Sequence, residues 1–228
     1  MRNFSHSLTF MISLTEENYL KAIFSLNANK KQSASTSAIA EKMETKASSV
    51  TDMLKRLKEK ELIHYKKYQA VSLTENGRKI AISIIRKHRL WEYFLVEKLH
   101  FGWEEVHDLA EQLEHIRSPK LTNRLEEFLD FPEFDPHGDP IPNQEGEFPM
   151  ELSETLSECG IGETVRVIGV KNHSADFLDH LNQLGIGLGT MIEVVEIVNF
   201  DQSFGIRIKE QKLRLSQEVA QNLYIKNH

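Results

Sequence analysis

Cysteine is almost absent from this 228-residue chain, which holds only Cys159. One cysteine cannot form an intramolecular disulfide, and it also excludes cysteine-rich zinc modules; both absences are typical of a protein in a reducing compartment. Long apolar runs are missing as well, because the run Leu8–Leu14 is too short to span a membrane and no small-residue cleavage site follows it. We therefore expect a cytoplasmic protein with no membrane partner.

An excess of negative charge is also missing from the amino-terminal third, although the whole chain has a formal charge of −6. Residues 1–75 carry 12 basic and 8 acidic side chains, residues 76–150 carry 9 and 15, and residues 151–228 carry 7 and 11. A basic first third favours a polyanionic partner, and an acidic middle third with clustered histidines favours a cation. The 40% hydrophobic content is typical of globular proteins, and the length favours about three small modules.

The first third has the pattern of a winged helix-turn-helix. Apolar periodicity predicts, in order, helices over Leu14–Leu26 (with Thr15 as N-cap), Ser35–Met43 and Ala47–Lys60, and a two-stranded wing over Leu62–Leu73. The turn between the second and third helices is only three residues long, as in helix-turn-helix proteins. We predict a DNA-binding domain over residues 12–82, with double-stranded operator DNA as its partner.

The outer face of the third predicted helix carries polar residues that suit DNA. The candidate DNA-binding residues are Ser48, Ser49, Thr51, Asp52, Lys55 and Arg56, together with Lys66 and Lys67 in the wing. Hydroxyls can contact phosphates or base edges, Lys and Arg more often hold the backbone, and Asp52 could accept from a cytosine amino group. The alternative is a solvated helix face, which the preceding turn and the basic wing disfavour.

The middle third places histidines and carboxylates on one side of predicted helices. We expect helices over Gly77–Lys98, Trp103–Arg117 and Leu121–Leu129, within a dimerisation and metal-binding domain at residues 83–139. His107, Glu111, Glu114 and His115 follow one another at i, i+4, i+7 and i+8, an arc of roughly 100° on one helix face. The preceding helix adds His88 and Glu92 at i, i+4. Adjacent carboxylates at the edge of a core repel, so a cation is their natural counter-charge, although any one histidine could be an ordinary hydrogen-bonding residue.

The last third predicts a small β-barrel. Strands are expected over Thr164–Val170, Met191–Val198 and Gly205–Leu215, with a helix over Asp176–Leu184 that ends at Gly185. Five prolines and two glycines over residues 131–149 forbid a helix there and indicate a loop, and we place a linker at residues 140–153. The expected fold is mainly α with a small β component: a winged helix-turn-helix, a central helical domain and an SH3-like β-barrel at residues 154–228.

These motifs together resemble the diphtheria-toxin-repressor and manganese-transport-regulator family, from about Leu14 to the end of the chain. The resemblance is carried by the segments EENYLKAI, SSVTDMLKRL, LTENGRKIA, RKHRLWE, VHDLAEQLEH and DPHGDPIP. It implies a homodimeric winged-helix repressor of metal-uptake genes, whose carboxy-terminal SH3-like domain is related to the ferrous-transport accessory protein FeoA.

Carried over by position, the resemblance implies two metal sites per subunit. One would use Glu111, Glu114 and His115 with Asn18 from the first helix. The other would use His88, Glu92 and His107, with Asp135 and His137 from the loop and one residue of the SH3-like domain, for which Asp176 is the candidate and His173 lies nearby. The alternative for Asp176 is an N-cap.

The same donors predict which metal is bound. A set of Asp, Glu and His without cysteine suits manganese or ferrous iron, whereas thiolate favours zinc or copper(I). In the family resemblance, Glu111 stands where iron-type members have cysteine, which favours Mn²⁺ over Fe²⁺ as corepressor. Asn18 stands where manganese-type members commonly have aspartate and iron-type members methionine, and it offers only a neutral oxygen.

Three other hypotheses stay open at this point. An Fe²⁺-dependent repressor of iron-uptake genes would use the same architecture. A metal-dependent hydrolase could use the same cluster, but the chain has no HExxH motif and no evident nucleophile. A metal-independent regulator could use its SH3-like module to bind a partner.

The favoured mechanism is a population shift in which metal selects the arrangement of two recognition helices that matches the operator.

Overall fold

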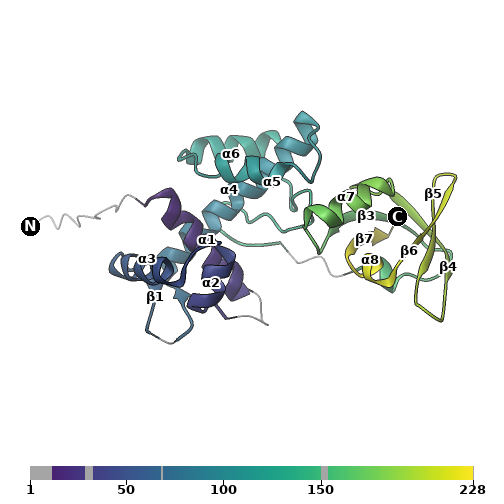
Figure 1. Cartoon of the computed structure of the whole chain (residues 1–228). Coiled ribbons are helices and arrows are strands. Elements are labelled where there is room, and N and C mark those ends of the chain that lie inside the picture. Colours follow the sequence, from purple (N-terminus) through teal and green to yellow (C-terminus); the bar gives the residue numbers. More distant parts are fainter. Residues whose placement is uncertain (1–11, 29–32, 68, 150–153, 228) are drawn as a thin grey trace, which may run out of the picture. The chain divides into compact units, whose positions relative to one another are not determined.

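The computed structural model describes residues 12–28, 33–67, 69–149 and 154–227. The chain divides into two compact units, Met1–Ile85 and Arg86–His228, which are described one at a time (Figure 1). Most of the apolar run Leu8–Leu14 lies outside the described residues. Among the residues that are described, no helix is both long and apolar enough to cross a membrane.

The first unit is a winged helix-turn-helix, as predicted. Its elements are α1 (Leu14–Ala28), α2 (Thr36–Lys42), α3 (Ala47–Glu59) and the antiparallel pair β1 (Ile63–His64) and β2 (Ser72–Leu73). Leu20, Ile23, Ile39, Leu54 and Leu57 are fully buried in one core, because each helix turns its apolar stripe toward the others. This core fixes α3 with its polar face outward.

The predicted N-cap of α1 was wrong by two residues. The backbone N–H of Ser13 donates to Glu16 Oε2 at 2.8 Å, and the N–H of Glu16 donates to Ser13 Oγ at 3.2 Å. This reciprocal pair is a capping box, which requires Glu or Gln three residues after the cap. Thr15 is followed at that spacing by Asn18. Ser13, with Glu16, therefore caps the helix.

Helix α4 (Glu75–Leu99) begins in the first unit, close beneath the wing. A Cβ added to Gly77 would lie 2.0 Å from the backbone carbonyl oxygen of Leu62. Alanine normally stabilises a helix over glycine by about 1 kcal/mol. Here the backbone at Leu62, just before the wing, would have to move to make room for the added Cβ.

Gly77→Ala is therefore expected to destabilise the first unit, by about 1–3 kcal/mol as in other overpacked sites. The measurement is the urea midpoint of its unfolding transition. Gly187→Ala is the matched control, because its added Cβ meets no atom within 4 Å and its φ is not positive. An increase in stability on Gly77→Ala, as helix propensity alone would give, would contradict the close approach.

The helical part of the second unit is shorter than expected. The later part of α4 packs with α5 (Val106–Leu113) and α6 (Pro119–Phe128) (Figure 1). The predicted helix over Trp103–Arg117 was too long at both ends. Ser118 caps α6 with its side chain and Pro119 follows as the first helical residue, so the chain has to leave α5 before this point. Trp103 is buried in the core of the carboxy-terminal domain instead of lying on a helix.

The carboxy-terminal domain is built on a five-stranded antiparallel sheet, which confirms the SH3-like class. In chain order its elements are η1 (Leu156–Glu158), β3 (Thr164–Val170), α7 (Ala175–Gln183), β4 (Met191–Ile197), β5 (Phe204–Ile208), β6 (Gln211–Leu215), α8 (Gln217–Gln221) and β7 (Leu223–Asn227). The strand order is β6-β5-β4-β3-β7, so within the described residues β6 and β7 form the two edges of an open sheet.

Two further details of the second unit differ from the prediction. The single strand expected over Gly205–Leu215 is a hairpin, in which Ile208 pairs with Gln211 across a two-residue turn and Lys209 has a φ of 54°. No glycine marks this turn, so the apolar alternation continues through it. The predicted linker also contributes to a core, because Ile141 is buried with Leu90, Leu125 and Leu129. Residues 150–153 lie outside the described residues.

Candidate metal centre

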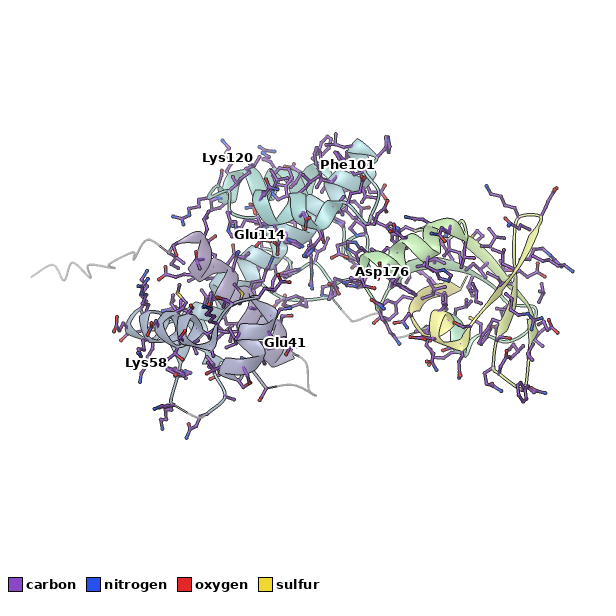
Figure 2. All side chains as sticks on the ribbon, viewed as in Figure 1. Glu41, Lys58, Phe101, Glu114, Lys120 and Asp176 are labelled. Atoms are coloured by element: carbon purple, nitrogen blue, oxygen red, sulfur yellow. The ribbon has the colours of Figure 1, made fainter. Side chains whose placement is uncertain are left out.

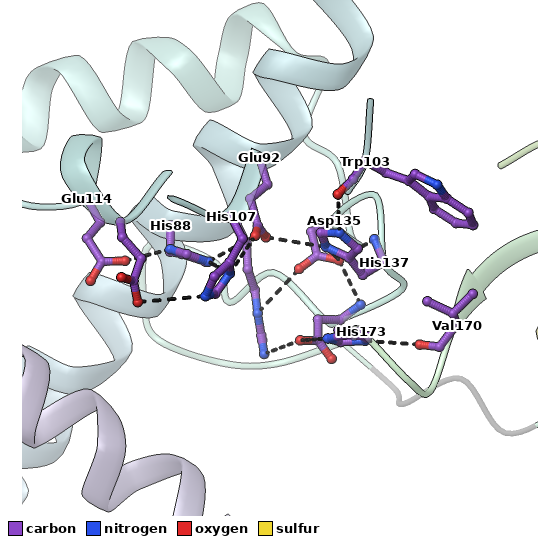
Figure 3. A network of polar contacts seen from close by, with 12 residues as sticks. His88, Glu92, Trp103, His107, Glu114, Asp135, His137, Val170 and His173 are labelled. Carbon is purple, nitrogen blue, oxygen red and sulfur yellow. Dashed lines mark hydrogen bonds and ion pairs between the residues drawn. The ribbon is translucent and has the colours of Figure 1, made fainter. Parts of the chain in front are cut away.

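Two histidines and a glutamate form a tight triangle between α4 and α5 (Figure 3). His88 Nε2 lies 3.0 Å from Glu92 Oε1 and 3.2 Å from His107 Nδ1, and His107 Nδ1 lies 3.3 Å from Glu92 Oε1. Two donors on one ion with bonds of about 2.1 Å are roughly 3.0–3.4 Å apart in octahedral or tetrahedral geometry. The three donor atoms therefore have the spacing that a divalent cation requires.

Glu114 sets the orientation of His88. Its Oε2 lies 2.6 Å from His88 Nδ1, and its side chain is fully buried. A carboxylate can only accept here, so His88 Nδ1 carries a hydrogen, and Nε2 faces Glu92 as the nitrogen that could bind a metal. A histidine ligand fixed by a carboxylate on its other nitrogen is the usual outer-shell arrangement of protein metal sites.

A second buried group shares Glu92 with the first. Glu92, Asp135 and His137 offer donor atoms within 4.8 Å of one another. His137 Nδ1 lies 3.7 Å from Glu92 Oε2 and 4.0 Å from Asp135 Oδ1. His137 Nε2 donates to the carbonyl oxygen of Trp103 at 2.8 Å, which leaves Nδ1 to face the two carboxylates.

Arg89 holds the loop that carries this second group. Its Nε lies 3.7 Å from Asp135 Oδ2 and one terminal nitrogen lies 3.2 Å from Asp139 Oδ2, while the other donates to the Pro140 carbonyl oxygen. Asp135 Oδ1 also accepts from the backbone N–H groups of His137 (2.8 Å) and Asp139 (2.9 Å). Sequence reasoning missed Arg89, although it stands beside His88 in the RKHRLWE segment.

Protons and charges are shared closely across this centre. Burial raises the pKa of Glu92, but hydrogen bonds from His107, His137 and His88 outweigh it and hold that pKa well below its usual range. Burial lowers the pKa of His137, whereas its hydrogen bond to Glu92 and the charges of Glu92 and Asp135 raise it to about 9. Burial, with the charges of Glu92 and Asp139, raises the pKa of Asp135 to about 8. A divalent cation would replace these protons as counter-charge.

The remaining predicted ligands are not members of these two groups. Glu111 Oε1 is 3.7 Å from His107 Nε2, and His115 Nε2 is 3.9 Å from Glu114 Oε1. The predicted single helical face for these residues was wrong in detail, because α5 ends at Leu113 and Glu114 turns toward His88. Asn18 belongs to the first unit, where its Oδ1 is buried and has no hydrogen-bond partner among the described residues.

The SH3-like domain brings His173 near the centre. His173 Nδ1 lies 3.9 Å from Asp139 Oδ2, its ring centroid is 5.1 Å from that of His137, and Nε2 lies 3.1 Å from the Val170 carbonyl oxygen. Asp176 is exposed in the first turn of α7 (Figure 2). Ser174 is the N-cap of that helix, so the alternative role of Asp176 as N-cap was wrong.

The predicted DNA-binding residues lie on the outer side of the first unit. On α3, Ser48, Ser49, Asp52, Lys55 and Arg56 are exposed, as are Lys66 and Lys67 in the wing. Thr51 is half-buried, and its hydroxyl donates to the Ala47 carbonyl oxygen at 2.9 Å. Lys55 Nζ and Asp52 Oδ1 form an exposed ion pair at 3.1 Å. Positive side chains are thus available for phosphates without rearrangement of the core.

The sequence matches three family descriptions in chain order. Residues 11–71 match "Iron dependent repressor, N-terminal DNA binding domain", residues 74–143 match "Iron dependent repressor, metal binding and dimerisation domain", and residues 154–227 match "FeoA domain". All residues of the two ligand groups lie within the second of these regions, whereas the neighbouring His173 lies within the third.

Known proteins of repressor type share the fold and about a third of the aligned sequence. The diphtheria toxin repressor of Corynebacterium efficiens is 30% identical over 194 residues, which cover 79% of this chain and 83% of the relative. The iron-dependent repressor IdeR of Mycobacterium bovis is 35% identical over 128 residues, and the match spans only about half of that relative (55%). A solved structure described as a manganese-dependent transcriptional repressor in complex with manganese is 32% identical, with a TM-score of 0.73, and covers 93% of this chain and 100% of its own. From the ordered domain matches and these relatives, the chain belongs to the iron-dependent repressor family, which includes the diphtheria toxin repressor.

Proposed function

We propose that this protein is a metal-dependent DNA-binding transcriptional repressor of metal-uptake genes, with Mn²⁺ as its corepressor. The observation that carries the proposal is the triangle of His88, Glu92 and His107 in a chain that also bears a winged helix-turn-helix. A buried carboxylate with two histidines at ligand spacing favours a cation as counter-charge. The basic outer face of α3 would then bind the operator.

The donor chemistry supports manganese. Every donor in the two groups is a carboxylate oxygen or an imidazole nitrogen, a set that suits Mn²⁺ or Fe²⁺ better than metals that prefer thiolate. Cys159 is buried in the core of the carboxy-terminal domain, where burial and nearby carboxylates raise its pKa to about 11. Fe²⁺ is the alternative corepressor, since some relatives are named iron-dependent.

The mechanism follows from which residues the metal would join. His88 and Glu92 lie on α4, whose first turns belong to the DNA-binding unit. A cation held by these residues and His107 would supply electrostatic attraction that fixes α4 against α5. Asn18, Glu111, Glu114 and His115 are the proposed ligands of a further site, and Asp176 remains a proposed ligand from the SH3-like domain. In a homodimer, metal would favour one spacing of the two recognition helices.

A dimer is supported by apolar surface on the helical domain. Phe128 is 64% exposed and Leu121 is 41% exposed on α6, and Leu99 is exposed at the end of α4. Phe101, just after that helix, is also exposed (Figure 2). Exposed apolar residues that gather on one domain commonly mark a protein interface. We propose that this surface forms the dimer in the cytoplasm, and that the dimer binds an operator with two half-sites.

Operator titration tests the proposal directly. With DNA selected from a random pool by the Mn²⁺-loaded protein, we expect Mn²⁺ to raise affinity about 5- to 150-fold over chelator-treated protein. The paired substitutions Lys55→Ala and Arg56→Ala should weaken DNA binding and reduce its salt dependence. Lys209→Ala, in the β5–β6 turn of the carboxy-terminal domain, is the control. Equal operator binding with and without metal would contradict the proposal.

A further inference from the structure

A largely buried ion pair ties the first turn of α1 to the end of the recognition helix α3. Lys60 Nζ lies 2.7 Å from Glu16 Oε1 and 2.8 Å from Glu16 Oε2, so one ammonium group contacts both carboxylate oxygens. The Glu16 side chain is 6% exposed and that of Lys60 is 22% exposed. Lys60 is the C-cap of α3, and 44 positions separate it from Glu16. The pair is therefore a tertiary contact between two helix ends.

The carboxylate end of this pair is held firmly in place. Glu16 Oε2 also accepts from the backbone N–H of Ser13 at 2.8 Å, in the capping box that begins α1. Ion pairs between exposed, freely moving side chains contribute little, because water and side-chain freedom weaken them. Here the carboxylate is buried and fixed to the backbone. A movement of one helix end past the other would leave a buried charge without its partner, which is costly.

The rest of the packing between these helices has no such direction. In the first unit α1 packs mainly against α2 and β2, and α3 packs mainly against α2 and β1. The core that they share is apolar. Apolar burial opposes separation of the helices but is non-directional. The ion pair adds a point contact that also resists sliding and rotation.

We propose that Glu16 and Lys60 are positioning residues, which hold the recognition helix α3 at a fixed angle to α1. A displacement of α1 then carries α3 with it and is not absorbed between the two helices. Asn18 stands two residues after Glu16, and its buried Oδ1 has no hydrogen-bond partner among the described residues. Metal binding at Asn18 is thereby passed to the DNA-binding surface. This last step rests on the proposed function, in which Asn18 is a ligand.

The variants separate the ion pair from the helix cap. Glu16→Gln removes the charge, but glutamine can still accept from Ser13 in a capping box. Lys60→Met removes the other charge, and Lys60→Arg restores it. Lys79→Met is the matched control, because Lys79 forms an exposed ion pair on α4 that joins no two elements.

The first test measures helix position without metal or DNA. Spin labels are attached at Thr15→Cys and Lys58→Cys, two exposed positions on α1 and α3, in the full chain carrying Cys159→Ala. Labelled protein is diluted with unlabelled protein, and double electron–electron resonance gives the distance between the labels. We expect Glu16→Gln and Lys60→Met to broaden the distance distribution. Lys60→Arg should keep it narrow. An unchanged distribution in Glu16→Gln would overturn the proposal.

The second test compares operator affinity with Mn²⁺ and with chelator. The wild-type ratio is expected at about 5- to 150-fold. Glu16→Gln and Lys60→Met should each lower this ratio at least about fivefold, with metal-free affinity and bound Mn²⁺ unchanged. The double variant should be no worse than either single variant, because both lose the same interaction. Lys60→Arg should recover the ratio, and Lys79→Met should keep it.

The outcomes distinguish this proposal from the proposed function. Equal loss of operator affinity in both metal states would mean that Glu16 is only a structural residue. A broadened distribution with an unchanged metal ratio would reject the relay from Asn18. A wild-type ratio of one would reject the proposed function and the relay, whereas the spin-label result would still decide whether the pair holds α3. Circular dichroism identifies unfolding, and Lys60→Gln replaces Lys60→Met in that case.

Discussion

Replacing Glu92 with glutamine is expected to lower Mn²⁺ affinity at this centre at least about 100-fold, the upper end of losses seen when outer-shell partners alone are removed. The change keeps the size of the side chain but removes the charge and one acceptor oxygen that the two donor groups share. Because Glu92 contacts His88, His107 and His137, its loss weakens every ligand set that the described residues form. Competition with a fluorescent chelator measures the affinity.

The matched control for this prediction is Glu97→Gln. Glu97 lies on the same helix and is exposed, and it belongs to neither donor group. Its substitution should leave metal affinity unchanged. Metal-dependent operator binding should be lost in Glu92→Gln and kept in Glu97→Gln. Similar Mn²⁺ affinity in the two variants would show that Glu92 is a structural residue and not a ligand.

Leu54→Ala is expected to destabilise the DNA-binding unit by about 2–5 kcal/mol, the usual cost of truncating a fully buried leucine. Leu54 is 0% exposed and lies on the inner face of α3, so the cavity would form directly behind the proposed DNA-binding surface. Urea unfolding followed by circular dichroism measures the change. Leu14→Ala is the control, because Leu14 is 53% exposed on α1 and should cost little.

The same variant separates DNA binding from metal binding. Both donor groups lie in the second unit, so Leu54→Ala should weaken operator binding and leave Mn²⁺ binding at these two groups unchanged. Metal loss that parallels the loss of stability would contradict the placement of the ligands. Recovery of operator binding in Leu54→Met, which restores most of the volume, would tie the defect to packing.

Local patterns predicted the helical elements well where the apolar period was clean, as in α1, α2 and α3. The pattern failed where two signals competed. Ser13 has the Glu three residues later that a capping box needs, whereas Thr15 has only the general preference of a hydroxyl for the N-cap. The β5–β6 turn has no glycine or proline, so apolar alternation concealed it.

The sequence by itself determined the donor types of the candidate centre, because His88 and Glu92 stand at i, i+4, His107 follows on the next helix, and cysteine is absent from the donors. It also determined the winged helix-turn-helix, whose core depends on local apolar periodicity. Only the tertiary structure decided that Glu114 orients His88, that Arg89 holds the loop, and that Glu92 presents one oxygen to each donor group. Those contacts join residues far apart in the chain, and no local period encodes which oxygen of a carboxylate faces which partner.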